Sequence, residues 1–109
     1  MKESVIQNRI KSTLTRLSCI VYKFSSPAQR GVPDLIVITP GGLTVFLEVK
    51  QPGAKATAQQ QLHIDRINDK GSYAAVVCSA EEAENEVNMA RGLHDLPMLN
   101  LYVTPPGKL

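Results

Sequence analysis

Several features that mark other classes of protein are missing from this 109-residue sequence. No apolar run approaches the ~18 residues that a transmembrane helix needs, and the amino-terminal stretch lacks the apolar core of a signal peptide. Internal repeats and low-complexity segments are absent as well. We therefore expect one domain over residues 1–109, located in the cytoplasm.

Cysteine and histidine are scarce, with two of each. Cys19 and Cys78 stand apart, without a CxxC pair or a histidine nearby, which argues against a zinc site and favours two buried thiols in a reducing compartment. No glycine-rich phosphate loop precedes a helix, which argues against a small nucleotide hydrolase. The formal net charge of +2 is compatible with a phosphate-contacting surface but does not predict one.

What the sequence does contain is a hairpin pattern in its middle third. Two apolar runs, Leu35–Thr39 and Leu43–Val49, are joined by a Pro-Gly-Gly turn. Glycine accepts the positive φ that tight hairpin turns need, so we expect two antiparallel strands. Depending on the loop length, Asp34 then lies opposite Glu48 or Val49. Only one of these registers puts both carboxylates on the same face of the sheet.

Charged side chains end the second run of this hairpin. Glu48 and Lys50 share one face of an alternating strand that is otherwise largely apolar. Such charges are costly to bury unless they are paired or coordinated. Two carboxylates as close as Asp34 and Glu48 favour a shared proton or a divalent cation. A plain ion pair between Glu48 and Lys50 is the alternative, but it leaves Asp34 unexplained.

Helical spacing predicts three helices around the hairpin. The first covers Glu3–Leu17, the second covers Ala58–Lys70 after the N-cap Thr57, and the third runs from a capping box at Ser79 to about Arg91. The residues expected on or near the buried sides of the first two helices are Ile6, Ile10, Leu14, Leu17, Leu62, Ile64 and Ile67.

Three further apolar runs are expected to form strands, Cys19–Phe24, Tyr73–Cys78 and a short one at Met98–Val103. The chain order is therefore helix, three strands, helix, strand, helix. An antiparallel hairpin followed by a helical crossover gives a mixed sheet. We expect an α/β (α+β) fold in which this sheet is flanked by helices.

Short motifs around the hairpin form a recognisable series. Pro33-Asp34 is followed by Glu48-Val49-Lys50, and the wider context reads "RGVPDLI", "VFLEVKQP", "KATAQQ…IDRINDKG" and "AAVVCS". This series resembles the VRR-NUC branch of the PD-(D/E)xK nuclease superfamily, in the stand-alone form found in phages and bacteria. The resemblance covers roughly Glu3 to Ser79 and implies a restriction-endonuclease-like core.

A metal site is expected at these motifs. The carboxylates of Asp34 and Glu48 and the carbonyl of Val49 are hard oxygen ligands, which suit Mg²⁺ or Mn²⁺. The resemblance adds Glu3 as a further metal ligand. A carboxylate in the first turn of a helix is also stabilised by the helix dipole alone, so the two interpretations of Glu3 remain open.

The expected catalytic residues are Asp34, Glu48, Lys50 and Gln60. Lys50 would orient or deprotonate the attacking water and stabilise charge on the phosphate. Gln60 matches the active-site glutamine of the family when residues are counted back from Gly71. Two exposed cations, Arg30 and Lys55, are expected to hold flanking DNA phosphates. Arg30 could equally be a solvated loop residue.

The expected function is a Mg²⁺- or Mn²⁺-dependent, structure-selective DNA endonuclease. We expect a homodimer that resolves four-way (Holliday) junctions, because two symmetric cuts need two active sites. The apolar residues expected to form the dimer interface are Leu93, Leu96, Met98, Leu99 and Leu101. The alternatives are a monomeric nuclease of flaps or other branched DNA, and a non-catalytic nucleic-acid-binding domain. An ordinary edge strand could also account for the apolar carboxyl-terminal segment.

Overall fold

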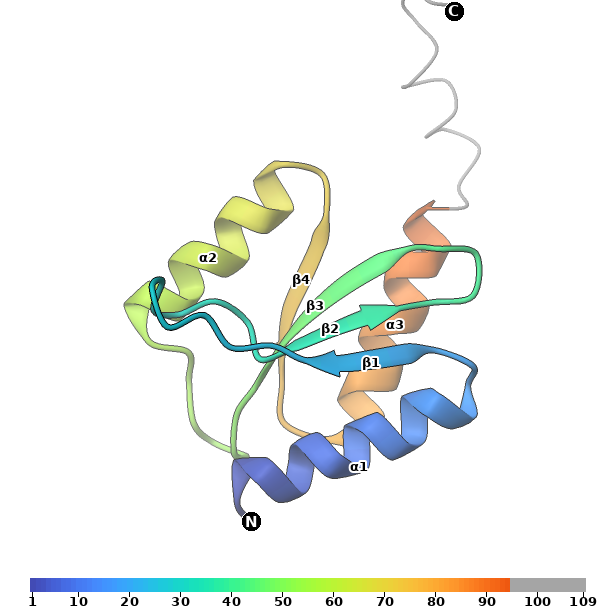
Figure 1. Ribbon diagram of the computed structural model, residues 1–109, viewed down its shortest axis with the longest axis horizontal. Helices are drawn as coiled ribbons and strands as arrows, with labels where there is room; N and C mark the ends of the chain where they lie inside the picture. The colour runs from blue at the N-terminus through green and yellow to red at the C-terminus, as the bar shows by residue number, and fades with distance from the viewer. Residues whose placement is uncertain (95–109) are drawn as a thin grey trace, which may run out of the picture.

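The computed structural model describes residues 1–94 as a four-stranded sheet with three helices (Figure 1). The elements are α1 (Glu3–Arg16), β1 (Ile20–Lys23), β2 (Leu35–Ile38), β3 (Thr44–Val49), α2 (Ala58–Asp69), β4 (Tyr73–Val77) and α3 (Ala80–His94). Their order and types match the sequence-based prediction, whereas the strand predicted at Met98–Val103 lies outside the described residues. No helix in residues 1–94 is both long and apolar enough to cross a bilayer.

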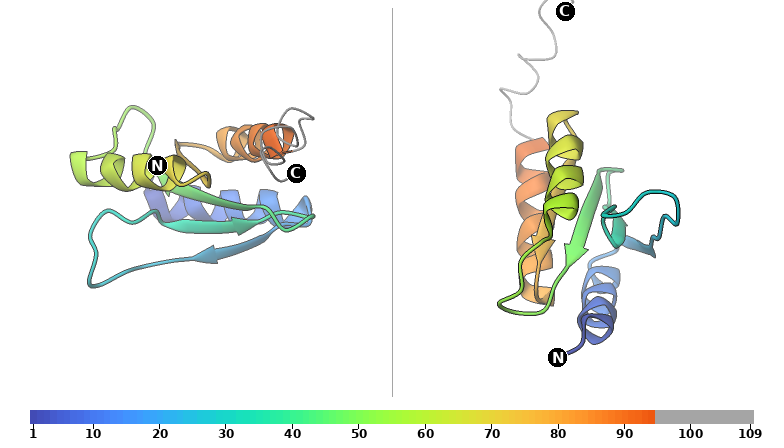
Figure 2. Two further views of the ribbon diagram at one scale, coloured as in Figure 1. Left: turned by 90° about the horizontal axis from the view of Figure 1, so that it is seen from above. Right: turned by 90° about the vertical axis from the view of Figure 1, so that its left-hand side faces the viewer.

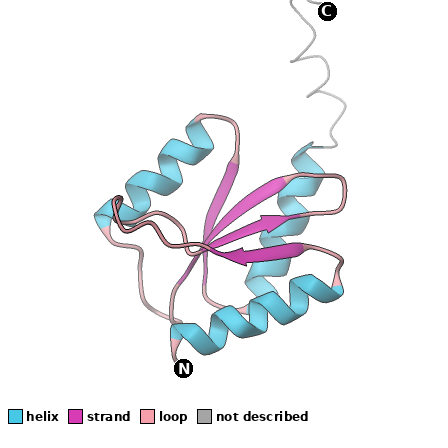
Figure 3. Ribbon diagram, in the orientation of Figure 1, coloured by secondary structure: helices cyan, strands magenta, loops and turns pink. Residues whose placement is uncertain are grey.

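The sheet is mixed, with the strand order β1-β2-β3-β4 (Figure 3). β1 and β3 both run antiparallel to β2, and β4 runs parallel to β3 after the crossover through α2. Both glycines of the β2–β3 turn have positive φ, as the predicted hairpin requires. β2 and β3 pair in the register Leu35 with Leu47. One step further along the same register, Asp34 comes opposite Glu48, so the two carboxylates share a face.

Helices cover the two faces of the sheet unequally. α1 and α3 pack against each other and against one face, where they bury the main core. α2 packs on β4 from the other side, and Figure 1 shows α2 and α3 on opposite sides of that strand. The largest fully buried side chains of the core are Ile10, Leu14, Leu47, Val37, Val45, Val49, Val77 and Val87. The strand residues in this core alternate along each strand, as burial of one sheet face requires.

Two predicted core residues are exposed. Leu17 is 40% exposed because α1 ends at Arg16 and the chain turns away at Ser18, which has φ of 67°. Leu62 is 50% exposed, and only Ile64 is fully buried on α2. A helix that rests on a single strand at the margin of the sheet buries a narrower stripe than its apolar spacing suggests.

Several predicted bounds shift by one to three residues. β1 begins at Ile20, because Cys19 still belongs to the turn that follows α1 and its N–H donates to the carbonyl of Leu14 at 3.0 Å. α2 ends one residue early at Asp69, and Gly71 follows it with φ of 90°, as a C′ glycine does. α3 continues past the predicted end to His94.

The loop between β1 and β2 is held against the start of α2. Figure 2 shows residues 24–34 reaching out at the end of the molecule where α2 begins. Gly31 in this loop has φ of 85°, and a Cβ placed on it would lie 2.9 Å from the backbone carbon and oxygen of Gln59. This position therefore needs glycine both for its backbone conformation and for its close packing.

A pair of glycine substitutions separates these two requirements. Gly53 has the same φ of 85° but nothing within 4 Å of its hypothetical Cβ, so Gly53→Ala should cost only the left-handed backbone energy, about 1–2 kcal/mol. Gly31→Ala should cost about 1–3 kcal/mol more, the typical cost of overpacking. Urea unfolding of both variants measures the difference. Equal losses would contradict close packing of this loop on α2.

Candidate active site

The polar residues predicted from the hairpin gather at one edge of the sheet. The strand register places the ends of β1, β3 and β4 and the start of β2 at this edge, where the strands converge in Figure 1. Asp34 directly precedes β2, Glu48 and Val49 close β3, and Lys50 follows. Neighbouring strands thus bring together residues that the sequence separates.

Asp34 is fixed through both its backbone and its side chain. Its carbonyl accepts a hydrogen bond from the N–H of Phe24 at 2.7 Å. Its carboxylate oxygen Oδ2 accepts one from the N–H of Val49 at 2.9 Å. The preceding Pro33 is fully buried, which further restricts the chain at this corner. The Asp34 carboxylate is therefore held across the β2–β3 gap beside Glu48.

Glu48 is the most constrained charge of the site, with only 2% of its surface exposed. Burial, followed by repulsion from Asp34 and a hydrogen bond with its side chain, raises the pKa of Glu48 to about 8. Without a bound cation, this carboxyl group is therefore mostly protonated at pH 7. A proton on one of the two carboxyl groups, or a cation between them, would remove this repulsion.

Gln60 connects the start of α2 to this carboxylate. Its amide Nε2 donates a hydrogen bond to Glu48 Oε2 at 3.2 Å. Its Oε1 accepts from the N–H of Thr57 at 2.9 Å, and its own N–H donates to the Thr57 hydroxyl at 3.2 Å, which completes a capping box. Of three consecutive glutamines, Gln60 is thus the one that reaches Glu48. Its side-chain amide thus joins the Glu48 carboxyl group to the N-cap of α2.

The charges of Lys50 and Glu3 shift the pKa of the Glu48 carboxyl group in opposite directions. The positive charge of Lys50 lowers the pKa of Glu48, and the negative charge of Glu3 raises it as the smallest of the named effects. Lys50 is half-buried, and its backbone N–H donates to the carbonyl of Val77 at 2.9 Å. Glu3 is half-buried in the first turn of α1. Both predicted residues are therefore close enough for their charge to be felt at Glu48.

The two predicted DNA-contacting cations are exposed on loops that flank α2. Arg30 directly precedes Gly31, the residue that packs on Gln59. Lys55 lies two residues before Thr57, the N-cap of α2. Lys55 is therefore close in sequence to the start of the helix that supplies Gln60, and Arg30 is the chain neighbour of a residue that packs on that start.

The oxygen donors at this edge fit a hard divalent cation. Among residues 1–94, no cluster of three or more His, Cys, Asp or Glu side chains could hold a metal ion, so Glu3 does not complete such a group. Mg²⁺ commonly binds through one or two carboxylates and keeps several waters. Asp34 and Glu48 meet that requirement. The Val49 carbonyl is expected to face the same side as its N–H, toward Asp34.

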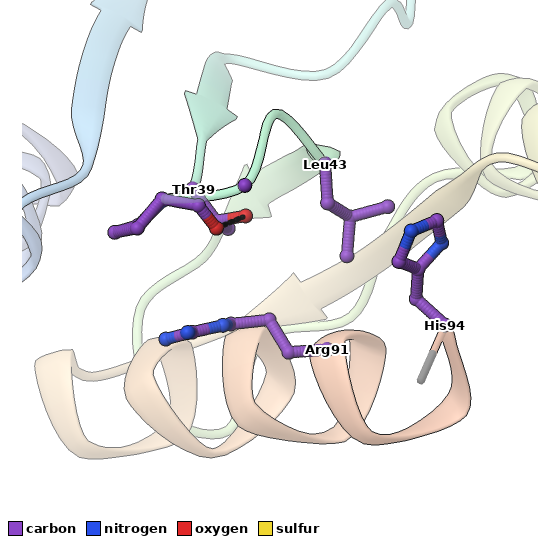
Figure 4. Close-up of a pocket in the computed structure, with 6 residues that line it drawn as sticks. Thr39, Leu43, Arg91 and His94 are labelled. Atoms are coloured by element: carbon purple, nitrogen blue, oxygen red, sulfur yellow. Dashed lines mark hydrogen bonds between the residues drawn. The ribbon is translucent and has the colours of Figure 1, made fainter. Parts of the chain in front are cut away.

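A hollow of about 430 Å³ lies at the opposite end of the strands. It is lined by the β2–β3 turn and by two basic side chains of α3, and Figure 4 shows Arg91 and His94 below the turn that carries Thr39 and Leu43. It lacks the carboxylate pair. The carboxylate pair, and not this hollow, is therefore the candidate active site.

Solved structures share this fold. One, described as "VRR_NUC domain", is 30% identical and superposes with a TM-score of 0.71 over 79% of this chain and 94% of its own. A second, described as "VRR_NUC domain protein", is 20% identical with a TM-score of 0.67, over 85% of this chain and 90% of its own, and supports the fold alone. The fold and the site together thus define a nuclease-type domain.

Sequence comparison gives the family. The VRR-NUC domain matches residues 2–81, and the chain therefore belongs to the VRR-NUC family of nucleases. A relative named "Putative nuclease p44", from Acyrthosiphon pisum secondary endosymbiont phage 1, is 36% identical over 81 residues, which are 74% of this chain and 87% of the relative. The resemblance inferred from the sequence motifs is confirmed.

The sequence contains a second, physical indication that Gln60 is the glutamine that lies at the start of α2. Thr57-Ala-Gln-Gln60 has the T-x-x-Q spacing of a capping box, which folds the third residue of a helix back over its start. That spacing selects Gln60 over Gln59 and Gln61 on physical grounds. Phe46, Arg66 and other side chains beside the site had no comparable signal, because only the packing of α2 brings them together.

Gln60→Glu tests the contact with Glu48 separately from the cap. Glutamate also accepts at this capping-box position, so thermal stability should change by less than ~1 kcal/mol. The substitution replaces the amide that donates to Glu48 by a further carboxylate beside Asp34 and Glu48. The added negative charge should raise the pKa of Glu48 and lower nuclease activity at neutral pH at least tenfold. Activity profiles against pH measure both effects. Gln61→Glu is the matched control, because Gln61 is exposed and bonds only to Asp65; equal losses in both variants would contradict this role of Gln60.

Glu48 should make the metal-free protein less stable as pH rises. The folded state keeps a proton that the unfolded chain loses above pH 4.5, so the contribution of Glu48 to the unfolding free energy falls between pH 4.5 and about 8, then levels off. The slope is at most ~1.4 kcal/mol per pH unit. Glu48→Gln should flatten this slope, measured by urea unfolding in EDTA. The substitution Glu81→Gln, at an exposed position of α3, should leave the slope unchanged. An unchanged slope in Glu48→Gln would refute the buried-carboxyl assignment.

Proposed function

We propose that this protein is a Mg²⁺- or Mn²⁺-dependent DNA endonuclease that cleaves branched substrates. The observation that carries the proposal is the buried Glu48 carboxyl beside Asp34, an arrangement in which two carboxyl groups repel each other and offer hard oxygen ligands. Membership of the VRR-NUC family supplies the nuclease class. Metal dependence, endonucleolytic cleavage and branch selectivity are the parts that we add.

Asp34, Glu48 and the Val49 carbonyl would hold the cation, with Glu3 contributing through a bound water. When bound, the cation would supply charge stabilisation at the phosphate and a more acidic water. Its charge would also replace the proton that Glu48 otherwise keeps, so metal binding should release a proton near neutral pH. Gln60 would act as a positioning residue, because its amide holds one oxygen of Glu48.

Lys50 would be the residue that touches the reacting phosphate. It follows Val49 directly, is half-buried, and already exerts its charge on Glu48. From this place its ammonium group would orient the attacking water and stabilise the negative charge that develops on the phosphorane. Arg30 and Lys55 would hold neighbouring phosphates from the two loops beside α2.

A homodimer that resolves four-way junctions is the specific form of this proposal. Two symmetric cuts require two active sites, which a two-fold dimer supplies. Of the predicted interface residues, Leu93 is exposed, and Leu96, Met98, Leu99 and Leu101 lie outside the described residues. β1 is an edge strand, and exposed Ile20 and Tyr22 on it offer a further apolar contact surface.

We also propose that the protein acts in the cytoplasm of a bacterial or phage-infected cell. The support for this location is the phage origin of the relative that is 36% identical. The DNA of an infecting phage and of its host are both present in that compartment, and branched intermediates form there.

Cleavage of a substrate panel tests the proposed function. Single-stranded, duplex, flap and four-way-junction DNA should be compared with Mg²⁺ and with EDTA, and we expect paired symmetric cuts in the junction that EDTA abolishes. Lys50→Met should reduce turnover by about 10²–10⁴-fold while calorimetry shows unchanged Mg²⁺ binding; exposed Lys11→Met is the control. A protein that sediments as one chain and cuts flaps but not junctions would exclude the resolvase and support the monomeric alternative. Full cleavage in EDTA would exclude the metal site.

A further inference from the structure

A second hollow, of about 370 Å³, lies beside the candidate active site. Its lining comes from three parts of the chain that are distant in sequence: Phe46 of β3, Gln29 of the β1–β2 loop, and one side of α2. His63 and Arg66 of α2 and Lys70, the residue that caps its end, recur at helical spacing, so they line the hollow from one side of the helix.

The floor of this hollow is on the same side of the sheet as the carboxylates. Phe46 and Glu48 are two residues apart on β3, so their side chains project from the same face, roughly 7 Å apart. Gln60, which bonds to Glu48, and His63 are one turn apart on α2. The lining of the hollow therefore begins two residues along β3 and one turn along α2 from residues of the site.

The lining combines an aromatic ring with cationic and amide groups. Phe46 is half-buried, which leaves part of its ring accessible. Arg66 and Lys70 are exposed and carry the positive charge, and Gln29 adds an amide on the loop side. Aromatic rings stack on nucleic-acid bases, and arginine and lysine bind phosphates. A nucleotide offers both partners in one unit.

Arg66 has a simpler role that must be separated from this one. It lies in the last turn of α2, where a cation stabilises the helix dipole. The dipole does not account for the Phe46 ring and the Gln29 amide at the same hollow. It does supply a matched control, because Arg16 occupies the last turn of α1 in the same way.

We propose that this hollow binds an unpaired nucleotide of the DNA substrate, next to the phosphate that is cut. Its base stacks on Phe46, and Arg66 and Lys70 hold its phosphate. This inference rests on the proposed nuclease function and extends it to the choice of substrate. A base inside a duplex must be unstacked and unpaired before it can enter such a pocket. Branched DNA presents splayed nucleotides without that cost, so the pocket gives the enzyme its preference for branches.

Binding without cleavage tests this proposal. Fluorescence anisotropy in EDTA should compare a short single-stranded oligonucleotide with a blunt duplex of equal length. Arg66→Ala should weaken binding of the single strand several-fold and reduce the slope of log affinity against log salt by about 0.7. Arg16→Ala removes the same charge from the last turn of another helix and should leave both values unchanged. Equal effects of the two substitutions would overturn the phosphate contact.

Phe46 provides the second, independent measurement. Phe46→Leu keeps an apolar side chain but loses the ring, and it should weaken single-strand binding about 5- to 100-fold with little effect on the duplex. Phe46→Tyr keeps the ring and should retain wild-type affinity. Equal loss of affinity for both DNA forms in Phe46→Leu would overturn base stacking. If that variant does not fold, the comparison of Arg66→Ala with Arg16→Ala decides whether the hollow binds the strand. Wild-type protein that neither binds nor cuts DNA would instead refute the proposed nuclease function itself.

Discussion

The close approach of Asp34 and Glu48 is the constraint on which the rest of the site depends. The β2–β3 register puts the two carboxyl groups on one face, and burial leaves Glu48 with little solvent beside Asp34. Such an arrangement costs stability in the protein alone, because one group must keep its proton. Functional sites often keep destabilising arrangements of this kind. The well-packed sheet face beneath α1 and α3 contributes the stability that offsets the destabilising carboxyl pair.

α2 is the element that links the carboxylates to the hollow beside them. Its first turn reaches Glu48 through Gln60, and its remaining turns border the hollow that contains Phe46. The position of this helix is fixed from two directions, by β4 beneath it and by Gly31 packed on Gln59. One helix therefore sets both the orientation of the Glu48 carboxyl group and the shape of the neighbouring hollow. Small displacements of α2 would affect both together.

The sequence predicts the elements well and the tertiary details less well. Alternation and turn chemistry identify the hairpin, but they leave Asp34 opposite either Glu48 or Val49, because register depends on how the turn closes. Apolar spacing places Leu62 on a buried side, yet α2 covers too little of the sheet to bury it. The carboxylates, Lys50 and the choice among the glutamines come from motifs and the family resemblance. The hollow beside them is formed by packing between distant segments, which no local pattern encodes.

The hairpin also has a consequence for the order in which the protein folds. Asp34 and Val49 are fifteen residues apart and Glu48 and Gln60 twelve, whereas Glu3 comes from the far end of the sequence. Contacts between residues that are close in sequence form early, because little chain entropy is lost in closing short loops. We therefore expect the two carboxyl groups to meet before α1 docks over the sheet. Their repulsion would then act while the sheet forms, so we expect proton concentration to influence the rate of folding as well as the final stability.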